Sequence, residues 1–166
     1  RVSLDPRNVY ASTKVTQEHL LAAWARQTGA TGAAMRFHNV NGPGAPRDNP
    51  FSGVASIFLS DVLAGRSPKV TEDGGQRRDF VHVSDVAHAN VLALTNEQPA
   101  AGAFNVCSGT PRTILDMAGA LRPGGAPAPR VVGGYRLGDI RHVFANPERA
   151  AARLGFRAAV TFEDGM

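Results

Sequence analysis

The sequence has 166 residues and a mass of 17.5 kDa, and 43% of them are hydrophobic, so it has the size and composition of one globular domain with a core. Its net charge of +4 suits an anionic ligand such as a nucleotide diphosphate, but no run of basic residues is longer than Arg77-Arg78, so we expect no nucleic-acid partner. The single cysteine, Cys107, excludes an internal disulfide and fits a reducing cytoplasm, and the absence of a long apolar run argues against a membrane partner.

The first predicted helix covers residues 10–28, a stretch that contains no glycine or proline and is stopped by Gly29. Tyr10 and Lys14 lie four residues apart in this helix, so we expect them on one face. An ammonium beside a phenol favours the phenolate, and such a tyrosine can take a proton from a sugar hydroxyl and return it. Taken alone, this spacing is also what a solvated helix face produces.

Helices and strands alternate along the rest of the chain. Further helices are predicted over 54–64, 85–95, 114–121 and 147–154, with another beginning near 162. Strands are predicted over 33–37, 69–71, 79–83, 103–106, 130–132 and 142–144, and a long loop over 42–50. Ser84 and Thr113 are expected to cap the helices that follow them. The alternation predicts an α/β fold.

A glycine motif for a dinucleotide is missing from the sequence. An α/β protein that binds a nicotinamide cofactor normally carries strand, G-x-G-x-x-G and helix in that order. The nearest match, Gly29-Ala30-Thr31-Gly32, follows a helix and precedes a strand, so we interpret it as a helix stop. The chain therefore has no predicted cradle for a pyrophosphate.

Five blocks in order carry a family resemblance: YASTK at 10–14, RFHNVNGPG at 36–44, QRRDFVHVSDVA at 76–87, FNVCSG at 104–109 and YRLGDIRH at 135–142. Together they resemble the C-terminal half of the extended short-chain dehydrogenase/reductases, in the NAD-dependent epimerase/dehydratase group. The branch that they resemble most is that of the UDP-glucose 4-epimerases, and the resemblance covers residues 4–165.

This resemblance implies a role for residues of the first two blocks. Tyr10 matches the catalytic base of the family, and Lys14 matches the lysine that activates it and binds the nicotinamide ribose. The backbone around His38 and Val40 is expected near the nicotinamide amide. NAD is the implied cofactor.

The resemblance also implies contacts to a nucleotide sugar linked to UDP or dTDP. Asn39 matches an asparagine that touches the substrate phosphates, and the backbone near Val70 is expected to meet the base. Arg78 matches an arginine that pairs with the diphosphate, because its planar fork suits phosphate oxygens. Arg136 and Arg141 lie in the segment that supplies a further phosphate or ribose contact, and we favour Arg141.

The implied fold joins a piece of a Rossmann-type domain to a smaller domain. Residues 1–45 are expected to supply the Tyr-Lys helix and one strand of the Rossmann-type sheet, and residues 46–166 mostly the substrate-binding domain. The half with the glycine motif is absent, and so is the Ser or Thr that completes the catalytic triad before the tyrosine. We expect the exposed strand 33–37, or the Tyr10 helix, to join copies into a homo-oligomer.

The function implied is a fragment of a nucleotide-sugar epimerase that inverts the sugar 4-position by transient oxidation, with the tyrosine as base. Without its dinucleotide half, the chain alone is expected to be inactive. One alternative is a non-catalytic nucleotide-sugar-binding module, or a module that a partner chain completes. Another is a fragment of a dTDP-glucose 4,6-dehydratase or a UDP-sugar decarboxylase.

Several polar residues also have plainer interpretations. Arg78 could be a solvated loop arginine beside Arg77. Asp79, His82 and Asp85 could suggest a metal, but they fall on a strand and a helix start, where a carboxylate is favoured by the helix dipole, so no metal site is predicted. Cys107 is expected to be a packed side chain and not a nucleophile.

Overall fold

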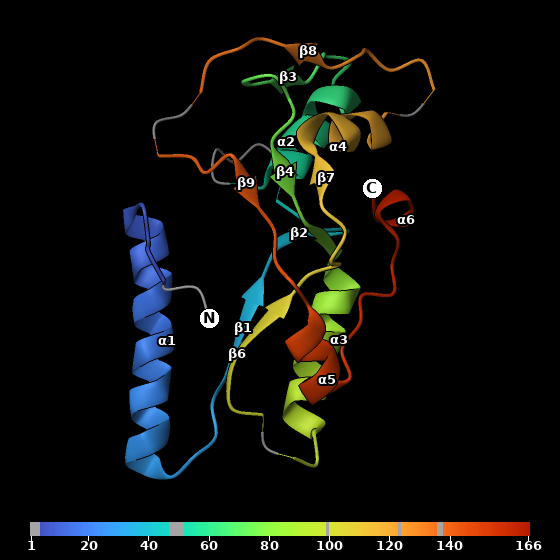
Figure 1. Cartoon of the computed structure of the whole chain (residues 1–166). Coiled ribbons are helices and arrows are strands. Elements are labelled where there is room, and N and C mark those ends of the chain that lie inside the picture. The colour runs from blue at the N-terminus through green and yellow to red at the C-terminus, as the bar shows by residue number, and fades with distance from the viewer. Residues whose placement is uncertain (1–3, 47–51, 99, 123, 136–137) are drawn as a thin grey trace.

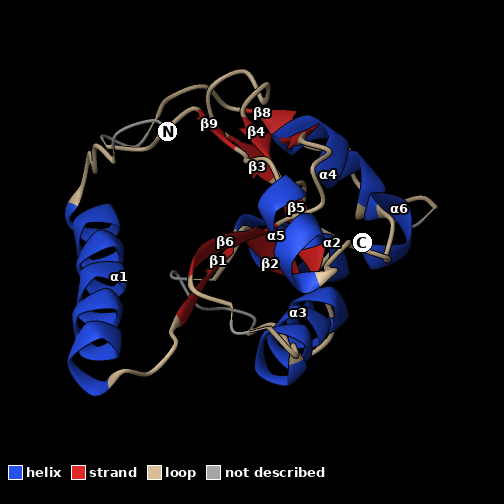
Figure 2. Ribbon diagram, turned by 60° about the horizontal axis from the view of Figure 1, so that its bottom comes forward, coloured by secondary structure: helices blue, strands red, loops and turns tan. Residues whose placement is uncertain are grey.

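A computed structural model describes residues 4–46, 52–98, 100–122, 124–135 and 138–166 of the chain. It confirms the α/β class, with short parallel strands at the centre and helices around them (Figure 1). The helices and strands fall into a lower group around β1 and β6, an upper group around β4, and one long helix, α1, to the side (Figures 1 and 2). Among the described residues, no helix combines the length and the apolar character that crossing a bilayer demands.

Helix α1 (Val9–Thr28) begins one residue before its predicted start. Asn8 is its N-cap, and the Asn8 side chain accepts a hydrogen bond of 2.8 Å from the backbone N–H of Ala11. Gly29 ends it in the left-handed conformation, as predicted. Glu18 ties the helix to the next strand, because its carboxylate accepts from the Nε and Nη2 atoms of Arg36 at 2.6 and 2.7 Å. No residue of α1 is buried.

The lower group is built on two parallel strands, β1 (Ala33–Phe37) and β6 (Gly102–Val106), paired in register from Ala33 and Gly102 to Phe37 and Val106. Helices α3 (Val83–Thr95) and α5 (Glu148–Leu154) cover this pair. The core between them consists of Val81, Val86, Ala89, Ala100, Phe104, Val106, Ala150, Leu154 and Phe156. In the described part of the chain, β6 is the only strand paired with β1, so the other edge of β1 is open.

A second parallel pair, β2 (Asn39–Asn41) and β5 (Phe80–His82), continues upward from the first. No strand was predicted over 39–41, but the backbone N–H of Asn39 donates to the carbonyl of Asp79 at 2.9 Å and draws the chain into this pairing. The prediction of Ser84 as helix cap was wrong. α3 begins at Val83, and the His82 side chain accepts from the backbone N–H of Ser84, so His82 is the cap.

The upper group holds the remaining strands. β4 (Arg77–Arg78) lies between antiparallel β7 (Arg112–Thr113) and parallel β9 (His142–Val143), while β3 (Lys69–Val70) pairs with β8 (Arg130–Val131) in parallel. Neither β4 nor β7 was predicted, since each has two residues and depends on its neighbours for pairing.

Three helices surround the core of the upper group: α2 (Val54–Leu63), α4 (Ile114–Ala120) and α6 (Phe162–Gly165). The core residues are Phe58, Val70, Phe80, Ile114, Met117, Ala118 and Leu121. Thr113 caps α4 as predicted and forms a capping box with Asp116. The two cores meet at β5, where Phe80 belongs to the upper core and Val81 to the lower one.

Candidate functional site

Tyr10 and Lys14 occupy the first turns of α1 and lie together, as their spacing predicted. The Lys14 Nζ atom is 5.4 Å from the centre of the Tyr10 ring, and it also donates to Gln17 at 3.3 Å. Tyr10 is 71% exposed, so its phenol faces solvent. The pair therefore offers an accessible phenol beside a cation, which is the arrangement that proton transfer to or from a ligand hydroxyl requires.

His38, Asn39 and Val40 follow each other where β1 passes into β2. The backbone N–H of His38 donates to Val106, and the Asn39 side chain is half-buried. Burial lowers the pKa of His38, although the carboxylate of Asp79 partly opposes this shift, and its Nδ1 atom is buried without a hydrogen-bond partner. Val40 is 41% exposed and presents an apolar surface.

Asp79 fixes the turn after β6. Its side chain is fully buried, and its two oxygens accept from the backbone N–H groups of Ser108 and Gly109 at 2.7 and 2.8 Å. Asp85 makes a similar contact with the backbone N–H groups of Ala159 and Val160, both at 3.1 Å. These carboxylates serve structure, and among the described residues no cluster of His, Cys, Asp and Glu could hold a metal ion.

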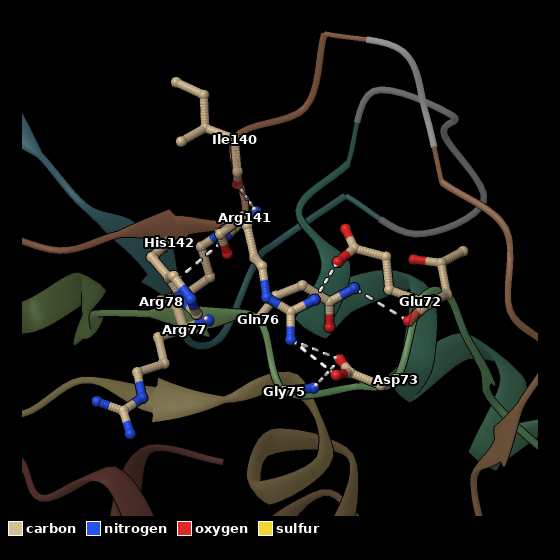
Figure 3. A network of polar contacts seen from close by, with 10 residues as sticks. Glu72, Asp73, Gly75, Gln76, Arg77, Arg78, Ile140, Arg141 and His142 are labelled. Atoms are coloured by element: carbon tan, nitrogen blue, oxygen red, sulfur yellow. Dashed lines mark hydrogen bonds and ion pairs between the residues drawn. The ribbon is translucent and has the colours of Figure 1, made fainter.

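Arg78 does not have the free guanidinium that a solvated loop arginine would have. Its Nη1 atom donates to the carbonyls of Arg77 and Arg141 at 2.9 and 2.7 Å, and its Nη2 atom to the carbonyl of Ile140 at 2.9 Å (Figure 3). Burial lowers its pKa from the ordinary value. The guanidinium of Arg78 thus holds the segment before β9 against β4. Its positive charge faces backbone carbonyls, and no carboxylate of the described residues lies within ion-pair distance of it.

Arg141 makes a different set of contacts. Its Nη1 atom pairs with Glu72, and its Nη2 atom donates to both oxygens of Asp73 at 3.0 and 2.7 Å (Figure 3). We call Glu72 and Asp73 the acid pair. No role was predicted for these two residues from the sequence, although two adjacent acids before Gly74 were a visible signal.

The remaining predicted contacts lie around the same segment. The Val70 side chain is fully buried, and its carbonyl accepts from Val132 at 2.8 Å. Gln76 donates to the carbonyl of Thr71, and its Oε1 atom is buried without a partner among the described residues. Arg136 lies outside the described residues.

The Tyr10 pair and the arginines are connected through α1. The Asn8 side chain, at the start of this helix, donates to the carbonyl of Gly138 at 3.4 Å. Gly138 precedes Ile140 and Arg141, so the start of α1 lies beside the segment that Arg78 holds (Figure 1). The structure thus brings the exposed phenol and the arginine cluster to the same end of the molecule.

Cys107 lies at the end of β6 and is packed, as predicted. It is 1% exposed, and burial raises the pKa of its thiol to about 11. A thiol in this state is protonated at neutral pH and is a poor nucleophile.

Comparison with known proteins gives a consistent picture. The profile of the NAD dependent epimerase/dehydratase family matches residues 1–107. The dTDP-L-rhamnose 4-epimerase of Burkholderia thailandensis is 37% identical over 162 residues, which cover 97% of this chain and 45% of that protein. The UDP-glucose 4-epimerase of Mycolicibacterium smegmatis is 33% identical over 171 residues, which cover 98% of this chain and 52% of that protein.

Among solved structures, the UDP-glucose 4-epimerase of Thermus thermophilus in complex with NAD superposes with a TM-score of 0.83 and 32% sequence identity. The match covers 97% of this chain and 52% of that chain. The chain therefore spans about half the length of the relatives and of the solved structure that it matches.

Proposed function

This chain belongs to the NAD dependent epimerase/dehydratase family, as its sequence predicted, and we propose that it forms the C-terminal half of a nucleotide-sugar 4-epimerase. The observation that carries the proposal is the exposed Tyr10 phenol with Lys14 against its ring, 5.4 Å from the ring centre. The similar proteins named above are 4-epimerases of dTDP-L-rhamnose and UDP-glucose, which supports a nucleotide sugar linked to dTDP or UDP as the substrate.

In this proposal Tyr10 exchanges a proton with the 4-hydroxyl of the sugar. Lys14 places its ammonium beside the Tyr10 ring, 5.4 Å from the ring centre. Arg78 takes part of the charge of the substrate diphosphate, and Asn39 adds a polar contact. Val70 and Arg136 remain proposed contacts to the nucleotide.

NAD is the cofactor of the family, and the Thermus relative is a complex with NAD. The residues of this chain fit only one end of it. Lys14 and Tyr10 are open to a nicotinamide ribose, and the backbone near His38 and Val40 could meet the amide. No glycine motif in the sequence could cradle the pyrophosphate. When bound, NAD supplies the acceptor for the transient oxidation, and we derive no step of this chain through it.

We therefore propose that a second α/β unit completes the site by adding a parallel strand to β1. The open edge of β1 offers unpaired backbone groups, and α1 beside it has no buried residue. From the sequence, only residues 1–45 were assigned to the Rossmann-type domain and residues 46–166 mostly to the substrate-binding domain. We propose to extend the Rossmann-type domain to β6, α3 and α5, because these elements share one core with β1. Most of the remainder forms the substrate-binding domain.

A different class of function has support in the same features. A chain that binds nucleotide sugars without turnover, or that a partner chain completes, would also keep the arginines and leave β1 open. Homo-oligomers through α1 or β1 are part of this alternative.

A dehydratase or decarboxylase remains a further candidate, since the family includes dehydratases. We propose a cytoplasmic location, which the reduced, packed Cys107 supports.

The first experiment is a calorimetric titration of the 166-residue chain with UDP, dTDP and NAD. We expect a nucleotide diphosphate to bind and NAD not to bind. Arg78→Lys should weaken nucleotide binding about tenfold, because it removes the fork, whereas Arg77→Lys on the same strand should not. Failure of both nucleotides to bind contradicts the proposed substrate. Binding of NAD to the chain alone contradicts the proposal that a second α/β unit is needed to complete the cofactor site.

A second measurement separates the half-enzyme from the partner-completed module. The polypeptide from its native source should have an intact mass of about twice 17.5 kDa if the chain is half of an epimerase. That polypeptide should epimerise a nucleotide sugar, and Tyr10→Phe should abolish the turnover. A native mass of 17.5 kDa favours the binding module instead.

The only tryptophan, Trp24, gives a direct reading of association at α1. It is 51% exposed in the isolated chain, so docking of a partner or a second copy should shift its emission to shorter wavelength. A dilution series with light scattering tests the homo-oligomer. A monomer at high concentration with unchanged emission contradicts self-association.

A further inference from the structure

We propose that the acid pair, Glu72 and Asp73, is a built-in competitor of the substrate diphosphate, and that it sets how tightly this chain holds a nucleotide. The inference rests on the proposed function, because it concerns the nucleotide contact of the same site. In this inference Glu72 and Asp73 act on nucleotide binding through Arg141.

The contacts of the two arginines differ in charge. Two carboxylates face the single guanidinium of Arg141, so this cluster has a net negative charge and offers no free cation to a phosphate (Figure 3). The guanidinium of Arg78 meets only carbonyls among its described hydrogen-bond partners. The site therefore presents one arginine without a carboxylate hydrogen-bond partner among the described residues, Arg78, and one neutralised arginine, Arg141.

The acid pair uses the donors that a phosphate would need. Arginine binds phosphate with parallel N–H groups of its fork. On Arg141, Nη1 is paired with Glu72 and Nη2 is shared between both oxygens of Asp73 at 3.0 and 2.7 Å. A diphosphate can reach this fork only by displacing a carboxylate, so the affinity of the site includes the cost of that exchange.

The backbone holds the acid pair in place. Asp73 also accepts from the N–H of Gly75 at 2.9 Å, and the N–H of Glu72 donates to Gly134 at 2.8 Å. Glu72 adopts φ +52°, a conformation that costs a non-glycine residue free energy. The Arg141 hydrogen bonds lower the pKa of Asp73, with help from the Gly75 N–H, so this carboxylate is charged at neutral pH.

Release of the Arg141 side chain leaves its backbone in place. The carbonyls of Ile140 and Arg141 are held by Arg78, and β9 pairs with β4 just beyond them. Neutralising the acid pair should therefore free a cation without unfolding the segment. The ion pairs are partly exposed, with the Asp73 side chain at 65% and that of Arg141 at 45%, so the competition is moderate in strength.

The experiment is a calorimetric titration of the full chain with UDP, for the wild type and for the variant Glu72→Gln with Asp73→Asn. These substitutions keep the shape and remove the charge, so UDP should bind roughly three- to tenfold more tightly at low salt. Adding Arg141→Gln to the double variant should abolish the gain, whereas Arg141→Gln in the wild type should change the affinity little. A purely structural role of the acid pair does not produce this dependence on Arg141.

The matched control is Glu163→Gln, which neutralises a carboxylate that pairs with Arg112 at a distance of 3.1 Å and not with Arg141. It should leave UDP affinity unchanged. Equal or weaker binding of UDP to the double variant overturns the inference and leaves the proposed function intact. If the double variant fails to fold, Asp73→Asn alone replaces it, because that side chain is exposed.

A second probe separates the two proposals. If the wild type binds no UDP, the proposed function fails, and inorganic pyrophosphate takes its place as ligand. Tighter pyrophosphate binding by the double variant, lost with Arg141→Gln, supports the competitor. Equal pyrophosphate binding by all variants overturns it.

Discussion

Two helices of this chain, α1 and α3, differ in how they are packed. α3 has 13 residues and buries Asp85, Val86 and Ala89 in or beside the lower core. α1 has 20 residues and buries none. The longer helix is held by its cap at Asn8 and by the ion pair between Glu18 and Arg36. A helix of this kind gains little free energy from the rest of the described chain.

The faces of α1 show where its missing contacts lie. Val9, Leu20 and Trp24 share one face of the helix and are 81%, 64% and 51% exposed. Ala11 and Val15 lie on the opposite face and are half-buried. The exposed apolar face of α1 lies opposite the half-buried one, so the contrast with α3 marks a surface of α1 that a partner of this chain would cover.

The largest expected effect is on the free energy of unfolding, when an aromatic side chain of the core and one of α1 are each replaced by alanine. Phe104 is fully buried in β6, so Phe104→Ala should lower the free energy of unfolding by about 3–5 kcal/mol. Trp24→Ala should change it by less than about 1 kcal/mol, because half of this side chain is exposed already. Urea titration followed by circular dichroism measures both. A large loss in the Trp24 variant of the isolated chain would show that α1 has packing partners after all.

The next effect concerns the carboxylate at the start of α3. Asp85 is buried and accepts from the N–H groups of Ala159 and Val160. Asp85→Ala should cost about 2 kcal/mol, since it leaves two part-buried backbone donors without their acceptor. Hydrogen exchange at residues 159 and 160 should become faster. Unchanged exchange there would mean that water or another acceptor replaces the carboxylate.

The same contrast explains what the sequence could predict. The 20-residue span of α1, the stop at Gly29 and the meeting of Tyr10 and Lys14 follow from local spacing and were predicted closely. The capping of α4 by Thr113 was local too. The cap of α3 was misplaced, because His82 and Ser84 can both cap and the choice depends on where β5 ends.

Contacts between segments that are distant in the chain could not be predicted from the sequence. Arg78 was expected to be either a phosphate clamp or a solvated arginine, but its fork meets carbonyls 62 and 63 residues further along the chain. The acid pair that binds Arg141 is separated from it by 68 and 69 residues. Only the pairing of β9 with β4 brings these groups together, and strands of two residues carry no periodic signal.

The smallest expected effect is a pH dependence of the ion pair between Glu18 of α1 and Arg36 of β1, which we call the tether. The hydrogen bond from Arg36 lowers the pKa of Glu18 below its ordinary value of 4.5, although partial burial opposes the shift. The unfolded chain therefore binds a proton at a higher pH than the folded one. The stabilisation is fully present above pH 4.5 and is lost as the pH falls through the lower, folded value.

The tether should contribute about 0.5 kcal/mol, because the Arg36 side chain is 39% exposed and solvent screens the pair. Glu18→Gln should remove this contribution at about pH 7 and flatten the pH dependence of α1 protection, measured by hydrogen exchange between about pH 6 and pH 3. Glu163→Gln is the matched control, since its pair with Arg112 does not involve α1. If Glu18→Gln leaves α1 as protected as before at neutral pH, the helix is held by contacts other than this ion pair, and the difference from α3 is smaller than the burial of the two helices indicates.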